Sequence, residues 1–280
     1  MVILLLVVIV YPIVFAVNTS FKHYVMFDKA NIGYIGFANY VRAFGDPVFH
    51  TSLIHTLQWV ALTLSFQFGI GLALALILNT QFRLRAIVRS LSLLPWVTPG
   101  VVIALMWMLI YDGNKGILNS LLVSAGILSD NVAWLANKDT SLYAQIVTQI
   151  WQGVPFFTIM ILAALQSIPG EQYESAMVDG ASAVRRFVFI TWPHILPTVI
   201  ITVFLRIIWV VNNTEIIYVM SQGGPGTSSL TVSVYTYMQA QKALDFGYAS
   251  ALAVIMTLIL SIFMVFYIRM LDRSGGIAGK

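Results

Sequence analysis

The apolar residues of the chain gather in six long runs, and the polar residues fall mainly between them. The runs cover residues 2–17, 54–78, 91–111, 142–165, 197–220 and 248–271. A membrane-spanning helix needs about 20 apolar residues, and each run must be helical because lipid offers no partner for unpaired backbone groups. A transmembrane barrel would alternate apolar and polar residues in strands of about ten. The pattern therefore predicts an all-α integral membrane protein, with six transmembrane helices in a single domain of residues 1–280.

Prolines and small residues modify this simple picture. Pro95 and Pro99 lie near the start of the third run, and Pro155 lies inside the fourth. Each proline removes a backbone hydrogen bond and kinks a helix, which is tolerated where protein or a water-filled cavity covers the break. The second run carries two pairs of small residues spaced four apart, Gly69 with Ala73 and Gly71 with Ala75. Such pairs let neighbouring helices approach closely, which indicates either a packed bundle or contact with a partner subunit.

The composition agrees with a membrane protein. Hydrophobic residues make up 59% of the chain and charged residues only 9%, whereas a soluble domain carries about 25% charged residues. The absence of Cys excludes disulfides and thiolate metal sites. Residues 1–17 show neither the basic start nor the cleavage site of a secretory signal, so we interpret the run 2–17 as the first span.

Lys and Arg in short loops indicate the orientation, because cytoplasmic loops are enriched in them. With six spans, three basic stretches lie on one side: Arg83, Arg85 and Arg89 after the second run, Arg185 and Arg186 after the fourth, and Arg269, Arg273 and Lys280 in the tail. We therefore predict that both termini and the segment 166–196 are cytoplasmic. No basic run is long enough to indicate a nucleic-acid surface.

The segment 166–196 predicts a short helix that projects from the bundle. Pro169 suits the first turn of this helix. Glu171 and Glu174 lie near its positive end, where acidic side chains are favourable. Gly180 is expected to interrupt it.

A second short helix is predicted after that glycine. It runs through Phe187 and Ile190, and Pro193 and Pro197 are expected to end it before the fifth span.

Three residues of the first short helix, Tyr173, Ala176 and Met177, fall on one narrow apolar face. Such a face either docks into a groove on another protein or lies on lipid headgroups. Interfacial helices usually combine a broad apolar face with a basic one, whereas this helix has acidic neighbours that anionic lipid repels. The pattern favours protein docking and leaves the lipid alternative open.

The same segment resembles the EAA motif of permease subunits in ATP-binding-cassette importers. That motif reads Glu-Ala-Ala, three residues, Gly, nine residues, Ile, one residue and Leu-Pro. The chain matches it at Glu174, Ala176, Gly180, Ile190 and Pro193. Ser175 replaces an Ala and is small enough for the same close contact, whereas Trp192 replaces the Leu and adds bulk.

Further stretches resemble carbohydrate permeases of the maltose-transporter type. They are "LPW" at 94–96, "LQSIP" at 165–169, "DGA" at 179–181, "GGP" at 223–225 and "GYASALAV" at 247–254. The similarity spans nearly the whole chain, and the order and spacing of the motifs agree throughout.

This resemblance implies a type I importer permease whose EAA helix sits in a cleft of a cytoplasmic ATPase and transmits its closure. It assigns the ATPase contact to Tyr173, Glu174, Ala176, Met177, Asp179 and Gly180. The implied partners are a second, different permease subunit, two copies of the ATPase and an extracytoplasmic sugar-binding protein that meets the loops 20–52 and 221–246. ATP and Mg²⁺ would be bound by the ATPase, with no cofactor in this chain. The implied location is a bacterial or archaeal cytoplasmic (inner) membrane.

The fifth run carries the densest set of polar residues inside a span, which is costly and indicates function. Four residues fall on one predicted helical face, namely Arg206, Trp209, Val210 and Asn213. A sugar offers hydroxyls to Arg and Asn and an apolar ring face to Trp. Polar side chains also join helices within a bundle, and the pattern alone does not decide between these interpretations.

The resemblance places all four of these residues where maltose-type permeases contact sugar. Alignment on the EAA motif adds Gln152, Gly153 and Phe156 of the fourth run. Val210 stands where the maltose permeases have a polar residue, so maltose itself is not indicated. Arg206 fits either an acidic sugar or an ion pair with a partner residue, and Glu215 is expected near the outer mouth.

The sequence does not indicate an enzyme. The tail "GGIAGK" lacks the first Gly and the Ser or Thr of a P-loop, and the four His show no metal-ligand spacing. Energy for transport must then come from another subunit. Two other classes stay open: a secondary transporter, which predicts an internal repeat and embedded acids, and a receptor, which would tolerate loss of the polar residues in the fifth run.

Overall fold

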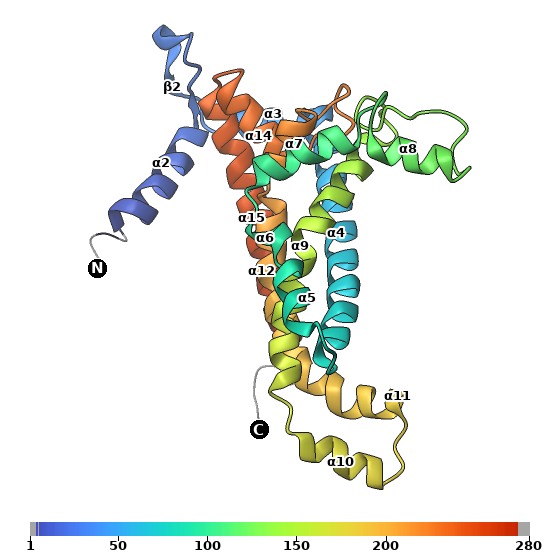
Figure 1. Ribbon diagram of the computed structural model, residues 1–280. Helices are drawn as coiled ribbons and strands as arrows, with labels where there is room; N and C mark the ends of the chain where they lie inside the picture. Colours follow the sequence, from blue (N-terminus) through green and yellow to red (C-terminus); the bar gives the residue numbers. More distant parts are fainter. Residues whose placement is uncertain (1–3, 5, 274–280) are drawn as a thin grey trace.

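The computed structural model describes residue 4 and residues 6–273 (Figure 1). Within them, four segments are long and apolar enough to cross a membrane: α4 (Pro47–Asn79), α9 (Ser141–Gln166), the segment Ala183–Met220, and α15 (Phe246–Arg273). A bent pair of helices makes a fifth if it is counted as one span. The N-terminal helix, η1 (Leu6–Val10) with α2 (Tyr11–Ser20), is apolar but shorter.

Six spans therefore stay a prediction. Val2, Ile3 and Leu5 of the first predicted span, and Lys280 of the basic tail, lie outside the described residues.

The long helices run side by side and carry distinct structures at their two ends (Figure 1). At one end a helical hairpin extends away from the bundle, formed by α10 (Gly170–Val178) and α11 (Ala183–Arg186). The opposite end is a cap that contains α3 (Ala38–Gly45), α8 (Ile117–Ser124), α14 (Val232–Gln241) and an antiparallel pair of short strands, β1 (Lys22–His23) and β2 (Gly33–Tyr34), with η2 (Lys29–Asn31) between them.

The α4 helix packs against α9 through a face of small and polar residues. Its buried positions recur every three or four residues and include Ser52, Thr56, Thr63, Gln67, Gly71 and Ala75. A Cβ atom on Gly71 would lie 2.5 Å from Cβ of Phe157, so the close approach of the two helices requires this glycine. Gly69 has no neighbouring atom within 4 Å of such a Cβ, and Ala73 is exposed, so this second pair makes no close helix contact within the described chain, and its contact with a partner subunit stays a prediction.

The third predicted span, 91–111, is not one straight helix. It consists of α5 (Arg85–Ser92), α6 (Leu94–Val97) and α7 (Gly100–Ile110), and the chain bends by 97° between α6 and α7. Thr98 and Pro99 are extended, with ψ of 132° and 138°. A proline disfavours helical geometry in the residue before it, which places the bend at Thr98.

The second arm of the hairpin is continuous with the fifth span, contrary to the prediction that Pro193 and Pro197 separate them. The helix runs from α11 through η3 (Phe187–Thr191), a π-helical turn, into α12 (Trp192–Val211). Pro193 occupies the first turn of α12, and the wider π turn before it relieves the hydrogen bond that a proline nitrogen cannot donate. The span breaks later, at residues 212–214, before α13 (Glu215–Met220).

Asp46 connects the cap to the bundle. Its Oδ2 accepts hydrogen bonds from the hydroxyls of Tyr235 at 2.5 Å and Tyr248 at 2.8 Å. Desolvation alone would raise the pKa of Asp46, but these hydroxyls, together with the backbone N–H groups of Val48 and Phe49, hold the pKa below its ordinary value. Arg42 and Asp245 form an ion pair at 2.7 Å beside this cluster. The loops 20–52 and 221–246 therefore meet at the same end of the molecule.

Candidate functional site

The hairpin at the lower end of Figure 1 is built by a helix stop at Gly180. Asp179 ends α10, and Gly180 follows with φ of +73°. The N–H of Ala181 then donates to the carbonyl of Ala176 at 2.8 Å, which is the helix-ending geometry that favours glycine. Ser182 begins the second arm by accepting a hydrogen bond from the N–H of Arg185. The predicted interruption at Gly180 is confirmed.

The residues of the apolar face predicted for the first helix differ in their exposure to solvent. Tyr173 is partly buried, and its hydroxyl lies 2.8 Å from the hydroxyl of Thr191 in the second arm. Met177 is 53% exposed, and two further valines near the turn are more exposed still, Val178 at 89% and Val184 at 73%. All three predicted residues lie in α10 at the expected spacing, but Tyr173 and Ala176 are partly buried on the side of the bundle whereas Met177 is exposed.

A second group of predicted residues meets in the bundle around Arg206. Arg206 is 5% exposed, and its Nε donates to Oε1 of Gln67 at 2.9 Å. Nε2 of Gln67 in turn donates to the carbonyl of Gln149 at 2.6 Å. A Cβ on Gly153 would lie 2.1 Å from Nη2 of Arg206, so a glycine is needed to admit the guanidinium.

This cluster has spare hydrogen-bonding capacity. In the described part of the chain, neither Nη2 of Arg206 nor Oε1 of Gln149 has a partner. The described residues form two ion pairs, His23 with Asp28 and Arg42 with Asp245, and neither includes Arg206. Within this chain, Arg206 therefore acts as a polar contact between α4, α9 and α12.

Three aromatic rings lie in contact beside the cluster. Phe156 of α9 packs against Trp209 of α12 at 5.1 Å between ring centroids and against Trp96 of α6 at 5.8 Å. Phe156 is buried, whereas Trp96 is 43% and Trp209 45% exposed. Two exposed indole rings on a rigid base form a surface suited to the apolar face of a sugar ring.

The four residues predicted on one face of the fifth span do not share one environment. Arg206 and Val210 are buried, and the carbonyl of Val210 accepts a hydrogen bond from Trp59 Nε1 at 3.0 Å. Trp209 is exposed, and Asn213 lies beyond the end of α12 in the break. Gln152 is partly exposed on α9.

Sequence reasoning missed Gln67, Gln149 and Trp96. Each carried a usable signal: the two glutamines are polar residues inside apolar runs, and the tryptophan belongs to the "LPW" stretch.

Glu215 lies where the two broken spans meet. Gly100 begins α7 and Glu215 begins α13, and a Cβ on Gly100 would lie 2.2 Å from Oε2 of Glu215. The carboxylate thus packs on the first turn of α7, whose positive end favours an anion.

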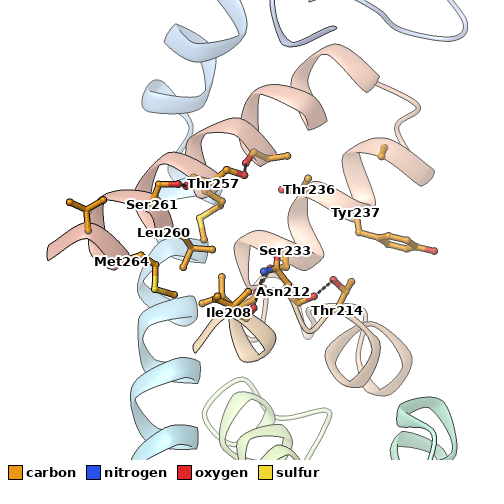
Figure 2. A pocket seen from close by; sticks show the side chains of 15 residues that line it. Ile208, Asn212, Thr214, Ser233, Thr236, Tyr237, Thr257, Leu260, Ser261 and Met264 are labelled. Carbon is orange, nitrogen blue, oxygen red and sulfur yellow. Dashed lines mark hydrogen bonds between the residues drawn. The ribbon is translucent and has the colours of Figure 1, made fainter. Parts of the chain in front are cut away.

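An open groove of about 820 Å³ lies on another side of the bundle, between α12, α14 and α15. Figure 2 shows Ile208 and Asn212, Ser233 and Tyr237, and Thr257 and Ser261 along its walls. Asn212 Nδ2 donates to the carbonyl of Ile208 at 2.8 Å, so that side chain is engaged locally. None of the seven residues predicted to bind substrate lines this groove.

Comparison with known proteins places the chain in a family. The profile described as "Binding-protein-dependent transport system inner membrane component" matches residues 67–274. The sulfoquinovosyl glycerol transport system permease protein SmoG of Agrobacterium fabrum is 34% identical over 269 residues, which cover 96% of this chain and 87% of that protein. The trehalose/maltose transport system permease protein MalF of Thermococcus litoralis is 31% identical over 84% of this chain and 79% of its own length.

Solved structures agree with this placement. A chain of a bacterial alginate ABC transporter, in complex with a periplasmic protein that holds an alginate pentasaccharide, matches with a TM-score of 0.85 and 25% identity, over 100% of this chain and 93% of that chain. A chain of the MetNI methionine ABC transporter shares the fold alone, with a TM-score of 0.58 and 17% identity over 79% of this chain and 94% of that chain. The chain belongs to the family of binding-protein-dependent transport system inner membrane components.

Proposed function

We propose that this chain is the translocation subunit of an ATP-driven importer that carries a sugar or an oligosaccharide into the cytoplasm. The family membership gives the class of transporter. Relatives named for sulfoquinovosyl glycerol, trehalose/maltose and alginate transport give the class of substrate.

One structural observation carries the proposal: the hairpin and the aromatic surface are joined by one continuous helix. Residues 183–211 run without a break from the turn of the hairpin to Trp209. A push on the hairpin is therefore delivered to the part of the bundle that would touch sugar. This is the arrangement that an importer driven from its cytoplasmic side requires.

The hairpin supplies a docking surface for a separate ATPase. Met177, Val178 and Val184 expose apolar side chains at its tip, and Glu174 is also exposed. Apolar side chains on a projecting turn suit a groove in a protein partner, and the acidic neighbours disfavour an anionic lipid surface. ATP and Mg²⁺ belong to that partner in this proposal, and this chain is not itself an enzyme.

The complete transporter would contain two permease subunits, two ATPase copies and a sugar-binding protein outside. A second permease is needed to enclose a path, because the aromatic surface lies open on one side of this chain. The binding protein would meet the cap end, where the loops 20–52 and 221–246 come together. With the hairpin in the cytoplasm, both termini lie there as well.

Uptake by reconstituted transporter tests the proposal. We expect ATP-dependent accumulation of one member of a panel of neutral and acidic sugars in proteoliposomes that also receive the binding protein. Gly180→Arg should abolish this uptake, because the side chain strains a φ of +73° and disturbs the docking turn.

Gly126→Arg is the matched control. Gly126 also has a positive φ, +71°, with open space around its Cβ direction, but it lies in the outer cap. Uptake should survive this change. Normal uptake by Gly180→Arg, or uptake that persists without ATP and without the ATPase, would contradict the proposal.

A further inference from the structure

We infer that the hydroxyl pair of Tyr173 and Thr191 is the joint that passes movement of α10 to the substrate-facing half of α12. This inference rests on the proposed function, since it concerns how the docked hairpin moves the span. It gives both residues a positioning role inside the chain, distinct from contact with the ATPase.

The pair is the side-chain hydrogen bond that connects the first arm of the hairpin to the helix 183–211 in the described part of the chain. The two hydroxyl oxygens are 2.8 Å apart. Thr191 is 5% exposed, and the ring of Tyr173 packs on the inner apolar cluster that also contains Ile195 and Val199 of α12. The first arm is thus anchored on the fifth span by a ring and by a directional bond.

Thr191 is oriented differently from other threonines of the spanning helices. Thr148, Thr158 and Thr202 each donate to the carbonyl four residues earlier, at 3.1, 2.9 and 2.6 Å. The Thr191 hydroxyl instead meets Tyr173. Thr191 is the last residue of the π-helical turn that precedes Pro193. The helix is therefore wider at the residue whose side chain contacts the first arm.

The turn between the two arms is a less direct route for movement of α10 than the Tyr173–Thr191 hydrogen bond. Gly180 has no atom within 4 Å of its Cβ direction, so the turn is not braced by packing there. By contrast, the helix from Thr191 to Trp209 is continuous and spans about 27 Å. A displacement of α10 that reaches Thr191 is therefore carried to Trp209 without having to pass through the turn.

The test measures sugar molecules imported per ATP hydrolysed. The full assembly is purified from its native cells through a tag on this chain and reconstituted in proteoliposomes with its binding protein. Tyr173→Phe keeps the ring and removes one hydroxyl, and Thr191→Val removes the other. We expect each variant to hydrolyse ATP while its import per ATP falls about five-fold, the size of effect that one neutral hydrogen bond supports.

Two further variants separate the joint from general packing. The double variant should be no worse than either single one, because both remove the same bond. Thr191→Ser keeps the hydroxyl and should retain the wild-type ratio. Tyr40→Phe is the matched control, since Tyr40 forms a similar hydroxyl pair with Ser20 at 2.6 Å in the outer cap. Unchanged ratios in both single variants, or effects that multiply in the double variant, would overturn the inference.

A distance measurement between the hairpin and α12 tests the inference even if a variant assembles poorly and cannot be assayed for transport. The chain has no Cys, so spin labels can be placed on introduced cysteines at two exposed positions, Val178 in the hairpin and Ile201 on α12. The distance distribution should be narrow in the otherwise unchanged chain and broad with Tyr173→Phe. Equal distributions would count against the joint. Failure of the unchanged assembly to import sugar with ATP would instead contradict the proposed function, whatever the variants do.

Discussion

At the scale of single residues, the fifth span shows how one helix serves two surfaces. Successive residues of a helix turn by about 100°, so Trp209 points about 60° to one side of Arg206 and Val210 about 40° to the other. That difference leaves Arg206 and Val210 inside the bundle and Trp209 at its surface. Arg206 can enter because Gly153 leaves room for its guanidinium. The aromatic surface is thus held by a polar contact directly behind it.

This arrangement predicts a specific effect on sugar binding. Trp209→Ala should raise the KM for the transported sugar about ten-fold with little change in maximal rate, because the stacking surface is lost while the continuous helix 183–211 is intact. Trp209→Phe should recover most of the affinity. Concentration-dependent uptake measures both.

Trp151→Ala serves as the control for the loss of an aromatic ring. Trp151 is 36% exposed on α9 and packs on Trp107, away from the aromatic surface of Trp96, Phe156 and Trp209. An equal rise in KM for Trp151→Ala and Trp209→Ala would argue against a dedicated sugar surface.

At the scale of helices, the length of the apolar runs predicted most of the spans. The differences arise where the backbone departs from a regular α-helix. The predicted runs 54–78 and 142–165 fall within α4 and α9, because a span must satisfy its backbone and cover its apolar residues. The break that Pro99 predicts in the third run is present, but the angle of 97° between α6 and α7 is not reported by any periodicity. The π turn before Pro193 is equally invisible in a pattern of residue types.

The candidate site was predictable only in part for a related reason. Helical spacing groups residues within one span, whereas the Arg206 cluster joins residues from three. Gln67 lies 139 positions before Arg206 in the chain. The motif at the hairpin, by contrast, is local in sequence, and its glycine stop could be located correctly.

The contact between α4 and α9 makes a prediction about stability. Gly71→Ala should lower the free energy of unfolding by about 1–3 kcal/mol, because its Cβ would press on Phe157 and on the α9 backbone. Gly69→Ala, two residues away on the exposed side of the same helix, should change it by less than about 1 kcal/mol. Unfolding in detergent micelles, followed by tryptophan fluorescence, compares the two. Equal stabilities for both variants would show that the helices can separate at this point without cost.

At the scale of the whole molecule, the bundle connects two ends with different structures, the cap and the hairpin (Figure 1). The cap is fastened to the long helices by Asp46 and by the Arg42–Asp245 ion pair. The hairpin projects from the other end with its apolar tip exposed. A helix that is continuous over residues 183–211 connects this hairpin to Trp209 of the aromatic surface, and the proposed function depends on that connection.

The most direct test is to identify what covers the tip of the hairpin in the native membrane. A photoreactive amino acid at position 178 should form an adduct with a protein that also binds photoreactive ATP, whereas the same group at Ile127, which is 69% exposed in the outer cap, should not. An adduct at position 178 with lipid alone, or with a protein that does not bind ATP, would contradict the account.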